Sequence, residues 1–230
     1  MSEPVETAGP AHSAPPPRAL PGSGAWRAGV LTADFVVERI GELTDHGATY
    51  VADVGQNQMW LARYLGFRLP NSHVSSGGLG TMGFSVPAAM GAALGRPDRE
   101  TWAITGDGGF QMTSQELMTL VQDRIPVKIA LFDNKKLGMI RQWQEIFYGG
   151  NYHSAHLLGP DFARLAEAYG IPAFRASAPD EVDPAIRAAQ SVDGPALIWF
   201  EIAETQNVFP MMPAGKGLSD LIEKWDGPEE

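Results

Sequence analysis

Two candidate ligand-binding side chains follow two neighbouring apolar runs of this 230-residue sequence, each of which predicts a strand. Asp107 lies in the glycine-rich turn 106–109, directly after the run 101–105, and Asn134 follows the run 127–132. The carboxyl ends of parallel strands meet at one edge of a sheet, where α/β proteins bind ligands. Glycines let backbone amides approach a phosphate, and a carboxylate beside a phosphate requires a cation such as Mg²⁺, which takes oxygen ligands. The pattern therefore predicts a phosphate and Mg²⁺ site.

Asp107 and Asn134 each have a commoner explanation when taken singly. An Asp in a glycine-rich turn often bonds its own backbone, and an Asn between a strand and a helix is often a helix N-cap. Their pairing at the ends of adjacent candidate strands favours one shared metal site over two unrelated turns.

A further glycine cluster, Gly78-x-Gly80-x-x-Gly83, has the spacing of a dinucleotide fingerprint. Its context argues against NAD, because residues 71–75 make a poor buried strand and Asp98 lies in a polar loop before a strand. No Gly-Lys-Ser or Gly-Lys-Thr follows any of these turns, which excludes a P-loop.

Helical and strand patterns that alternate from about Thr32 onward must position these residues. The predicted strands cover residues 50–54, 101–105, 127–132, 173–176 and 196–201. The predicted helices cover residues 35–43, 84–94, 113–122, 139–147, 161–169 and 180–190, and the third opens with a capping box from Thr113 to Glu116. Because the strands lack apolar–polar alternation and follow helices, we predict an α/β fold with a doubly wound, mostly parallel sheet and helices on both faces.

Composition narrows the class of protein. Lys and Arg total 17 against 27 Asp and Glu, so a formal charge of −10 gives no general attraction to nucleic acid. Residues 1–25, rich in Pro, Ala and Ser, predict a disordered tail before a domain at residues 26–226. The start lacks a signal-peptide pattern and the apolar stretch 84–94 is too short for a bilayer, so we expect a cytoplasmic protein without membrane contact.

Four further segments sharpen the prediction: 53–60 (DVGQNQMW), 76–83 (SGGLGTMG), 137–144 (LGMIRQWQ) and 208–215 (VFPMMPAG). Together with the turn at Asp107 and the Asn134 that follows, they resemble the C-terminal domain of the acetolactate synthase (acetohydroxyacid synthase) catalytic subunit, a thiamine diphosphate enzyme. The resemblance covers roughly residues 26 to 226 and keeps the motifs in order. It implies the thiamine diphosphate-binding fold.

The resemblance implies roles for single residues of this chain. Mg²⁺ would be ligated by Asp107, the side-chain oxygen of Asn134 and the main-chain carbonyl of Lys136. The expected cofactor contacts are Gly55, Gln56, Asn57, Gly80, Met82, Gly108, Gly109, Leu137, Gly138 and Met139. Met82 would be the apolar wedge beneath the thiazolium ring, and Trp143 would shape an acceptor pocket that favours 2-oxobutanoate over pyruvate. Without the surrounding motifs, core packing is the commoner explanation of Met82 and Trp143.

Two positions depart from the family's pattern. Asp133 stands where the family usually has the first Asn of a pair, and since that residue generally does not touch the metal, we expect the metal site to survive. Asn57 stands where many members have His, which weakens the expected contact of this residue with the diphosphate.

The resemblance covers one part of a larger catalytic subunit, which also has a pyrimidine-binding and a central domain. The Glu that activates the cofactor lies in the absent pyrimidine-binding part, so no catalytic residue is assigned to this chain. We therefore expect the cofactor-binding subunit of a split acetolactate synthase, in an oligomer with a separate chain that carries the other two domains and most of any FAD site. It would condense pyruvate with pyruvate or 2-oxobutanoate in branched-chain amino-acid biosynthesis.

Two other functions stay open on the sequence. Within the same cofactor class, the chain could be a subunit of another thiamine diphosphate-dependent 2-oxo-acid decarboxylase or oxidase, but the segment 138–143 argues for the carboligase. The missing Glu also allows a non-catalytic domain that binds thiamine diphosphate without turnover.

Overall fold

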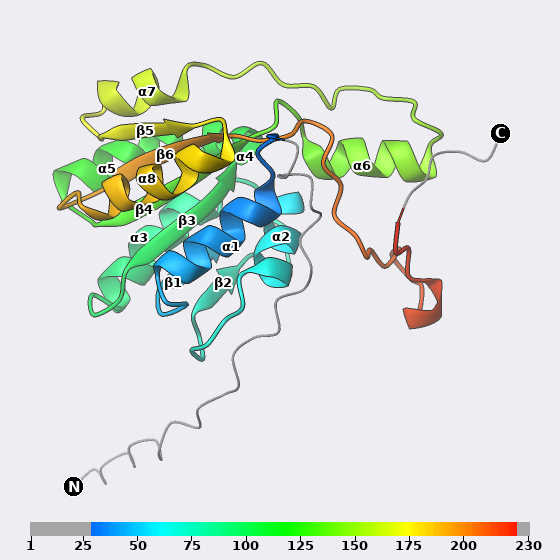
Figure 1. Ribbon diagram of the computed structural model, residues 1–230, viewed down its shortest axis with the longest axis horizontal. Coiled ribbons are helices and arrows are strands. Elements are labelled where there is room, and N and C mark those ends of the chain that lie inside the picture. Colours follow the sequence, from blue (N-terminus) through cyan, green and yellow to red (C-terminus); the bar gives the residue numbers. More distant parts are fainter. Residues whose placement is uncertain (1–28, 225–230) are drawn as a thin grey trace, which may run out of the picture.

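A six-stranded sheet forms the centre of the structure, a computed structural model that describes residues 29–224 (Figure 1). The tail predicted at residues 1–25 lies outside this range. The strands are β1 (Thr49–Ala52), β2 (His73–Ser75), β3 (Thr101–Gly106), β4 (Val127–Asp133), β5 (Ala173–Ala176) and β6 (Ala196–Glu201). They pair in the order β2-β1-β3-β4-β6-β5, and each pairing is parallel. The predicted doubly wound α/β fold is confirmed.

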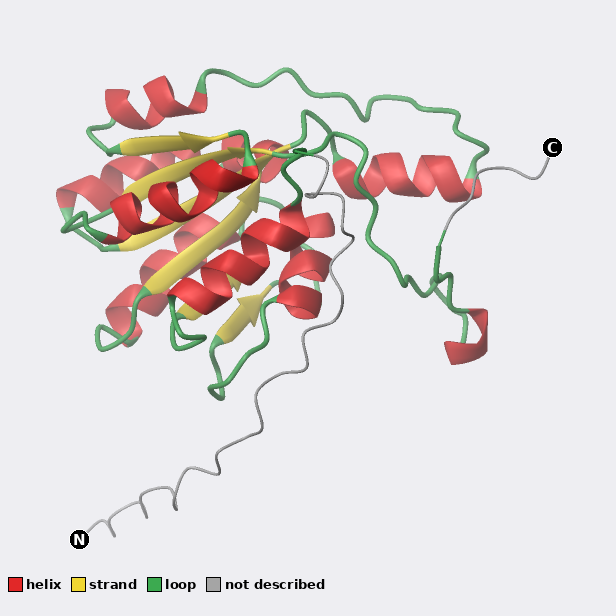
Figure 2. Ribbon diagram, in the orientation of Figure 1, coloured by secondary structure: helices red, strands yellow, loops and turns green. Residues whose placement is uncertain are grey.

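Helices cover both faces of the sheet (Figures 1 and 2). They are α1 (Ala33–Leu43), α2 (Gln56–Tyr64), α3 (Ser85–Gly95), α4 (Asp107–Met112), α5 (Leu117–Gln122), α6 (Gly138–Phe147), α7 (Phe162–Ala168) and α8 (Pro179–Gln190). α1, α2 and α8 pack on one face, and α3, α5 and α7 pack on the other. α6 projects beyond the sheet, and Gln142 in this helix bonds Val208 of the segment after β6 (Figure 1).

Alternate residues of the central strands supply two hydrophobic cores. In β4, Ala130 and Phe132 join the core beneath α1 and α8, whereas Ile129 and Leu131 join the core beneath α3 and α7. Every residue of β4 is buried, as expected of a parallel strand with helices on both sides. This burial explains why the continuous apolar runs of the sequence predicted the bounds of β3, β4 and β6 to within one residue.

Two elements near the edge of the sheet were not predicted, and one predicted helix is divided. α2 lies where a loop was expected after β1, and the half-exposed β2 is an edge strand. α4, from Asp107 to Met112, likewise lies where only a turn was predicted. The helix predicted at residues 113–122 consists of a 3-10 turn at Ser114–Glu116 followed by α5. The predicted capping box is wrong, because the Thr113 hydroxyl makes no capping bond and donates to the Gly83 carbonyl at 3.0 Å.

The chain reverses its direction across the sheet after β2. It passes from β1 outward to β2 at the edge and then crosses back to β3 on the other side of β1. The carboxyl ends of β1 and β3 therefore flank a topological switch point, where doubly wound proteins leave a crevice for ligands.

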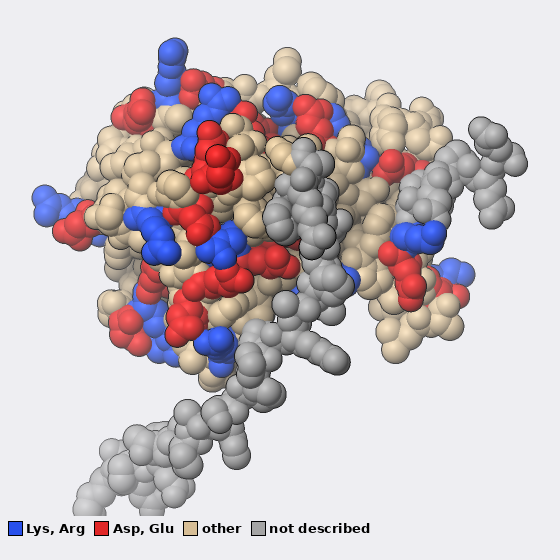
Figure 3. Space-filling view, in the orientation of Figure 1, with Lys and Arg blue, Asp and Glu red and all other residues tan. Residues whose placement is uncertain are grey.

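Charge is mixed on the face that carries α1 and α8 (Figure 3). Acidic and basic side chains alternate there, and Arg39 of α1 binds Asp183 of α8 through two hydrogen bonds of 2.6 and 2.7 Å. No helix between residues 29 and 224 is long and apolar enough to cross a membrane.

Candidate functional site

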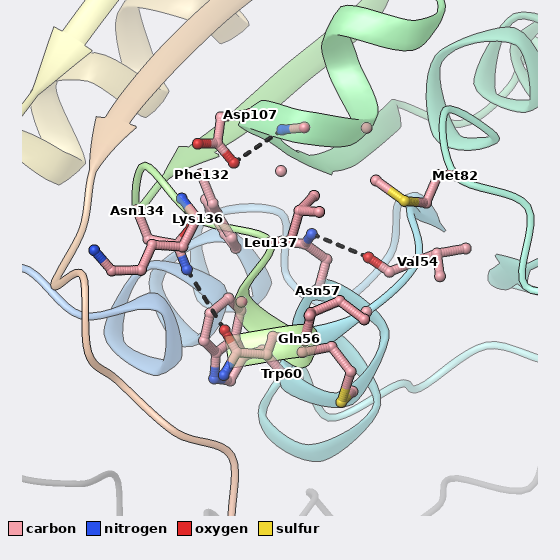
Figure 4. Close-up of a pocket in the computed structure, with 17 residues that line it drawn as sticks. Val54, Gln56, Asn57, Trp60, Met82, Asp107, Phe132, Asn134, Lys136 and Leu137 are labelled. Carbon is pink, nitrogen blue, oxygen red and sulfur yellow. Dashed lines mark hydrogen bonds between the residues drawn. The ribbon is translucent and has the colours of Figure 1, made fainter. Parts of the chain in front are cut away.

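A pocket opens at the switch point, where three helices begin (Figure 4). α2 begins at Gln56 after β1, α4 at Asp107 after β3, and α6 at Gly138 after β4. The first-turn amides of a helix lack partners within the helix and carry partial positive charge, which suits an anionic ligand. The lining residues are Val54, Gly55, Gln56, Asn57, Trp60, Met82, Gly106, Asp107, Gly108, Gly109, Phe132, Asn134, Lys136, Leu137, Gly138, Met139 and Ile140.

All but two of the predicted site residues line this pocket. Gly80 is exposed in the loop between β2 and α3. Trp143 is 44% exposed on α6 and borders a separate hollow with Ile140 and Tyr148. The roles expected of Gly80 and Trp143 would therefore require a ligand that extends beyond the pocket.

Two aromatic residues of the pocket wall were not predicted. Trp60 of α2 and Phe132 of β4 lie edge to face with their ring centroids 6.3 Å apart. Trp60 stands one helical turn after Gln56, so a prediction of α2 would have placed both residues on one side of the helix. Phe132 was predicted only as the last residue of a strand.

The two expected metal-ligating side chains both reach the pocket (Figure 4). One Asp107 oxygen accepts a hydrogen bond from the amide of Gly108 at 2.9 Å. Asp107 therefore makes the local backbone bond that is common in glycine-rich turns and also lines the pocket. Asn134 is not the N-cap of α6, a position that Leu137 occupies. Its side-chain oxygen instead accepts a hydrogen bond from the amide of Lys136 at 3.2 Å. This contact brings Asn134 and Lys136 to one turn of the pocket wall.

The surroundings of the Asp107 carboxyl disfavour its ionised form. It is only 2% exposed, and burial together with the neighbouring Asp133 carboxyl raises its pKa to about 7. Asp133 itself accepts hydrogen bonds from the Lys135 amide and the Trp199 ring nitrogen, both at 3.0 Å, and does not line the pocket. A divalent cation at Asp107 would offset this repulsion and favour the ionised carboxylate.

The donor set fits Mg²⁺. Within residues 29–224, no three His, Cys, Asp or Glu side chains gather as a metal site. A metal here would therefore take amide and carbonyl oxygens from Asn134 and Lys136 beside the one carboxylate of Asp107. Mg²⁺ is bound in this way in many proteins, through one or two side-chain ligands with phosphate oxygens and water.

The pocket wall also has the bare backbone that a diphosphate needs. A Cβ on Gly108 would lie 2.9 Å from Leu137 and 3.0 Å from Leu157, and a Cβ on Gly106 would lie 2.8 Å from the Asn57 side-chain nitrogen. Only glycine leaves the first turn of α4 open at this point. The side-chain oxygen of Asn57 is buried without a hydrogen-bond partner in the described chain, so a ligand or water can satisfy it.

The pKa of Asp107 predicts how the stability of the metal-free chain depends on pH. Between 3.8, the ordinary value, and about 7, the folded chain binds a proton at Asp107 that the unfolded chain has released, so the free energy of unfolding from this group falls as pH rises. Asp133→Asn removes the neighbouring charge and should flatten this dependence. Urea denaturation at pH 5, 6, 7 and 8 would measure it.

Because the slope of stability against pH sums over all titrating groups, the test is the difference in slope between the wild type and Asp133→Asn. The same slope in the wild type and in Asp133→Asn would contradict the interaction of Asp107 with Asp133. If Mg²⁺ binds the ionised carboxylate, excess Mg²⁺ should reverse the sign of this slope for the wild type, because a ligand that binds only the folded state stabilises it by mass action.

The fold and the pocket together define an α/β domain with a glycine-lined pocket, suited to an anionic ligand, at the switch point of a parallel sheet. Residues 53–200 match the family described as thiamine pyrophosphate enzyme, C-terminal TPP binding domain, and the chain belongs to that family. The matched segment begins at Asp53, at the end of β1, and includes all the residues that line the pocket.

The chain is also similar to curated proteins that are named acetolactate synthase. It is 46% identical over 198 residues to the acetolactate synthase large subunit of Corynebacterium glutamicum, which covers 84% of this chain and 32% of that protein. It is 39% identical over 195 residues to the acetolactate synthase isozyme 2 large subunit of Escherichia coli, covering 84% and 36%. The chain spans about a third of the length of these relatives. The resemblance seen in the sequence motifs is thereby confirmed.

Proposed function

We propose that the chain binds thiamine diphosphate with Mg²⁺ in this pocket, as the cofactor-binding part of an acetolactate synthase that condenses pyruvate with pyruvate or 2-oxobutanoate. The observation that carries the proposal is the convergence of Asp107, Asn134 and Lys136 on a glycine-lined pocket, in a chain of the thiamine pyrophosphate enzyme family. The relatives named acetolactate synthase support the reaction class.

The residues of the chain would divide the work of binding. Asp107, the Asn134 side-chain oxygen and the Lys136 carbonyl would hold Mg²⁺, while the amides of Gly108, Gly109 and the first turn of α2 would bind the diphosphate. Met82 and Met139 would pack against the rings. When bound, thiamine diphosphate supplies a carbon nucleophile that adds to a 2-oxo acid and an electron sink for the charge left by loss of CO₂.

We further propose that a second polypeptide completes the site. Asp107 is the one carboxylate among the described residues that line the pocket. Its proposed place beside the phosphates leaves no second carboxyl group to bond the cofactor's aminopyrimidine and start the proton transfer that activates the cofactor. The activating Glu would come from a chain with the pyrimidine-binding and central domains, which would also hold any FAD. Trp143, on the exposed side of α6, would face the acceptor substrate in that assembly.

Calorimetric titration of the full chain with thiamine diphosphate and Mg²⁺, with and without the candidate partner chain, tests this proposal. We expect weak binding alone, tighter binding with the partner, and acetolactate production from pyruvate by the mixture only. Acetaldehyde or acetate as the main product would indicate a decarboxylase or oxidase instead. Binding without any turnover would indicate a non-catalytic domain, and no binding in either mixture would contradict the cofactor site.

A further inference from the structure

The loop between β2 and α3, residues 76–84, carries an apolar side chain, Met82, that lies beside the glycine turn of α4. Figure 4 shows the Met82 thioether directed into the pocket from the side opposite Asn134. A Cβ on Gly108 would lie 3.6 Å from the Met82 terminal methyl group. Small shifts of this loop would therefore change the width of the pocket.

Asp53 ties this loop to the end of β1. The residue is 1% exposed, and its carboxylate accepts four hydrogen bonds. One oxygen accepts from the amides of Val54 at 2.9 Å and Gly83 at 3.0 Å, and the other accepts from the amide and the hydroxyl of Ser85 at 3.0 and 2.9 Å. Three of these donors belong to the loop or to the start of α3. A buried charge with this many donors is fully compensated and fixes their positions.

Thr113 holds the same loop from the opposite side. Its hydroxyl donates to the carbonyl of Gly83 at 3.0 Å, at the break between α4 and the turn that follows. Gly83 has φ +81°, and a Cβ there would lie 2.8 Å from the Thr113 methyl group, so the site accepts only glycine. Gly83 is therefore held through its amide by Asp53 and through its carbonyl by Thr113.

Asp53 also contacts the turn on the other side of the pocket. A Cβ on Gly109 would lie 2.8 Å from the Asp53 carboxyl carbon, so the backbone of Gly109 packs directly against this carboxylate. One side chain thus spaces the Met82 loop from the first turn of α4.

We propose that Asp53 and Thr113 are positioning residues that set the distance between Met82 and the glycine turn, and thereby the fit of a ligand that has both an aromatic ring system and a diphosphate. This inference rests on the proposed function. It assigns to the hydrogen bonds of Asp53 and Thr113 an effect on the ring end of the ligand, because three of the four donors to Asp53 and the acceptor for Thr113 belong to Gly83 and Ser85. The packing of Asp53 against Gly109 is a separate steric contact, which Asp53→Asn keeps because the two side chains are equal in size.

Two ligands distinguish effects on the ring end of the site from effects on its diphosphate end. With saturating Mg²⁺, the affinities of thiamine diphosphate and of inorganic diphosphate would be measured for the full chain, with the partner chain present. Asp53→Asn replaces one accepting oxygen by an NH₂ group, which cannot accept the two hydrogen bonds made there. Thr113→Val replaces the hydroxyl by a methyl group of similar size and removes its hydrogen bond to Gly83. We expect each variant to lower the affinity for thiamine diphosphate about tenfold, as for the loss of a buried hydrogen bond. The affinity for inorganic diphosphate should change less than about twofold.

Thr101→Val is the matched control, since the Thr101 hydroxyl is buried in β3 without a partner in the described chain. It should leave both affinities unchanged, and Thr113→Ser should restore the affinity that Thr113→Val loses. Thr113→Val keeps the test decisive if Asp53→Asn fails to fold.

Equal losses for both ligands would show a general structural role and overturn the inference, as would no loss for either. If the wild-type chain with its partner binds neither ligand, the proposed function itself fails. The two failures are therefore distinguishable.

Discussion

Asp107→Asn should remove Mg²⁺-dependent binding of thiamine diphosphate and, in the same protein, raise the stability of the metal-free chain. The substitution keeps the size of the side chain and removes the single carboxylate that lines the pocket within residues 29–224. Loss of residues that merely support metal ligands costs about 10- to 100-fold in affinity, so loss of the ligand itself should cost about 100-fold or more.

The gain in stability follows from the same charge. The pKa of Asp107 is raised to about 7, chiefly by burial and then by Asp133, so above that pH the wild-type chain folds with an unfavourable ionised carboxyl. Raising a carboxyl pKa by one unit costs the ionised form about 1.4 kcal/mol, and we expect Asp107→Asn to raise the free energy of unfolding at pH 8 by at least about 1 kcal/mol. Calorimetric titration and urea denaturation at pH 8 without Mg²⁺ measure the two effects.

Asp183→Asn provides the matched control. Asp183 is a carboxylate that accepts hydrogen bonds from Arg39 between α8 and α1 and does not line the pocket. Its replacement should leave cofactor affinity unchanged and lower stability slightly. An Asp107→Asn protein that binds the cofactor as tightly as the wild type would exclude Asp107 as a metal ligand, and one that is less stable at pH 8 would contradict the repulsion from Asp133.

The sheet was predictable because burial leaves a clear trace in the sequence. β4 has helices on both faces and reads as an unbroken apolar run, and Asp107 and Asn134 follow directly from the parallel arrangement of β3 and β4. The half-exposed β2 and the polar start of α2 have no such trace, since contacts with β1 and α1 stabilise them.

The contacts that shape the pocket were less predictable because they join segments far apart in the chain. The capping-box pattern at Thr113 predicts a local bond, but the hydroxyl instead reaches Gly83 from another loop. Asp53 was read only as part of a motif, although its carboxylate holds the start of α3. A polar side chain with several competing partners is assigned by tertiary geometry, which spacing alone does not contain.

Gly109→Ala and Gly91→Ala should change stability in opposite directions, although both residues lie in helices. A Cβ on Gly109 would lie 2.8 Å from the Asp53 carboxyl carbon, whereas a Cβ on Gly91 in α3 meets nothing within 4 Å. Asp53 cannot move aside without losing its four hydrogen bonds. We expect Gly109→Ala to lower the free energy of unfolding by about 2 to 4 kcal/mol and Gly91→Ala to raise it by about 0.5 to 1 kcal/mol, measured by urea denaturation.

A double-mutant cycle shows whether the Asp53 contact causes the loss. In an Asp53→Ala background the space beside Gly109 is open, so Gly109→Ala should cost at least about 1 kcal/mol less than it does in the wild type. An unchanged cost would mean that the clash lies elsewhere in α4. A reduced cost would establish that Gly109 in the glycine turn of α4 and the carboxylate that holds the Met82 loop are coupled through one direct contact, so that the two sides of the pocket are spaced by the same pair of residues.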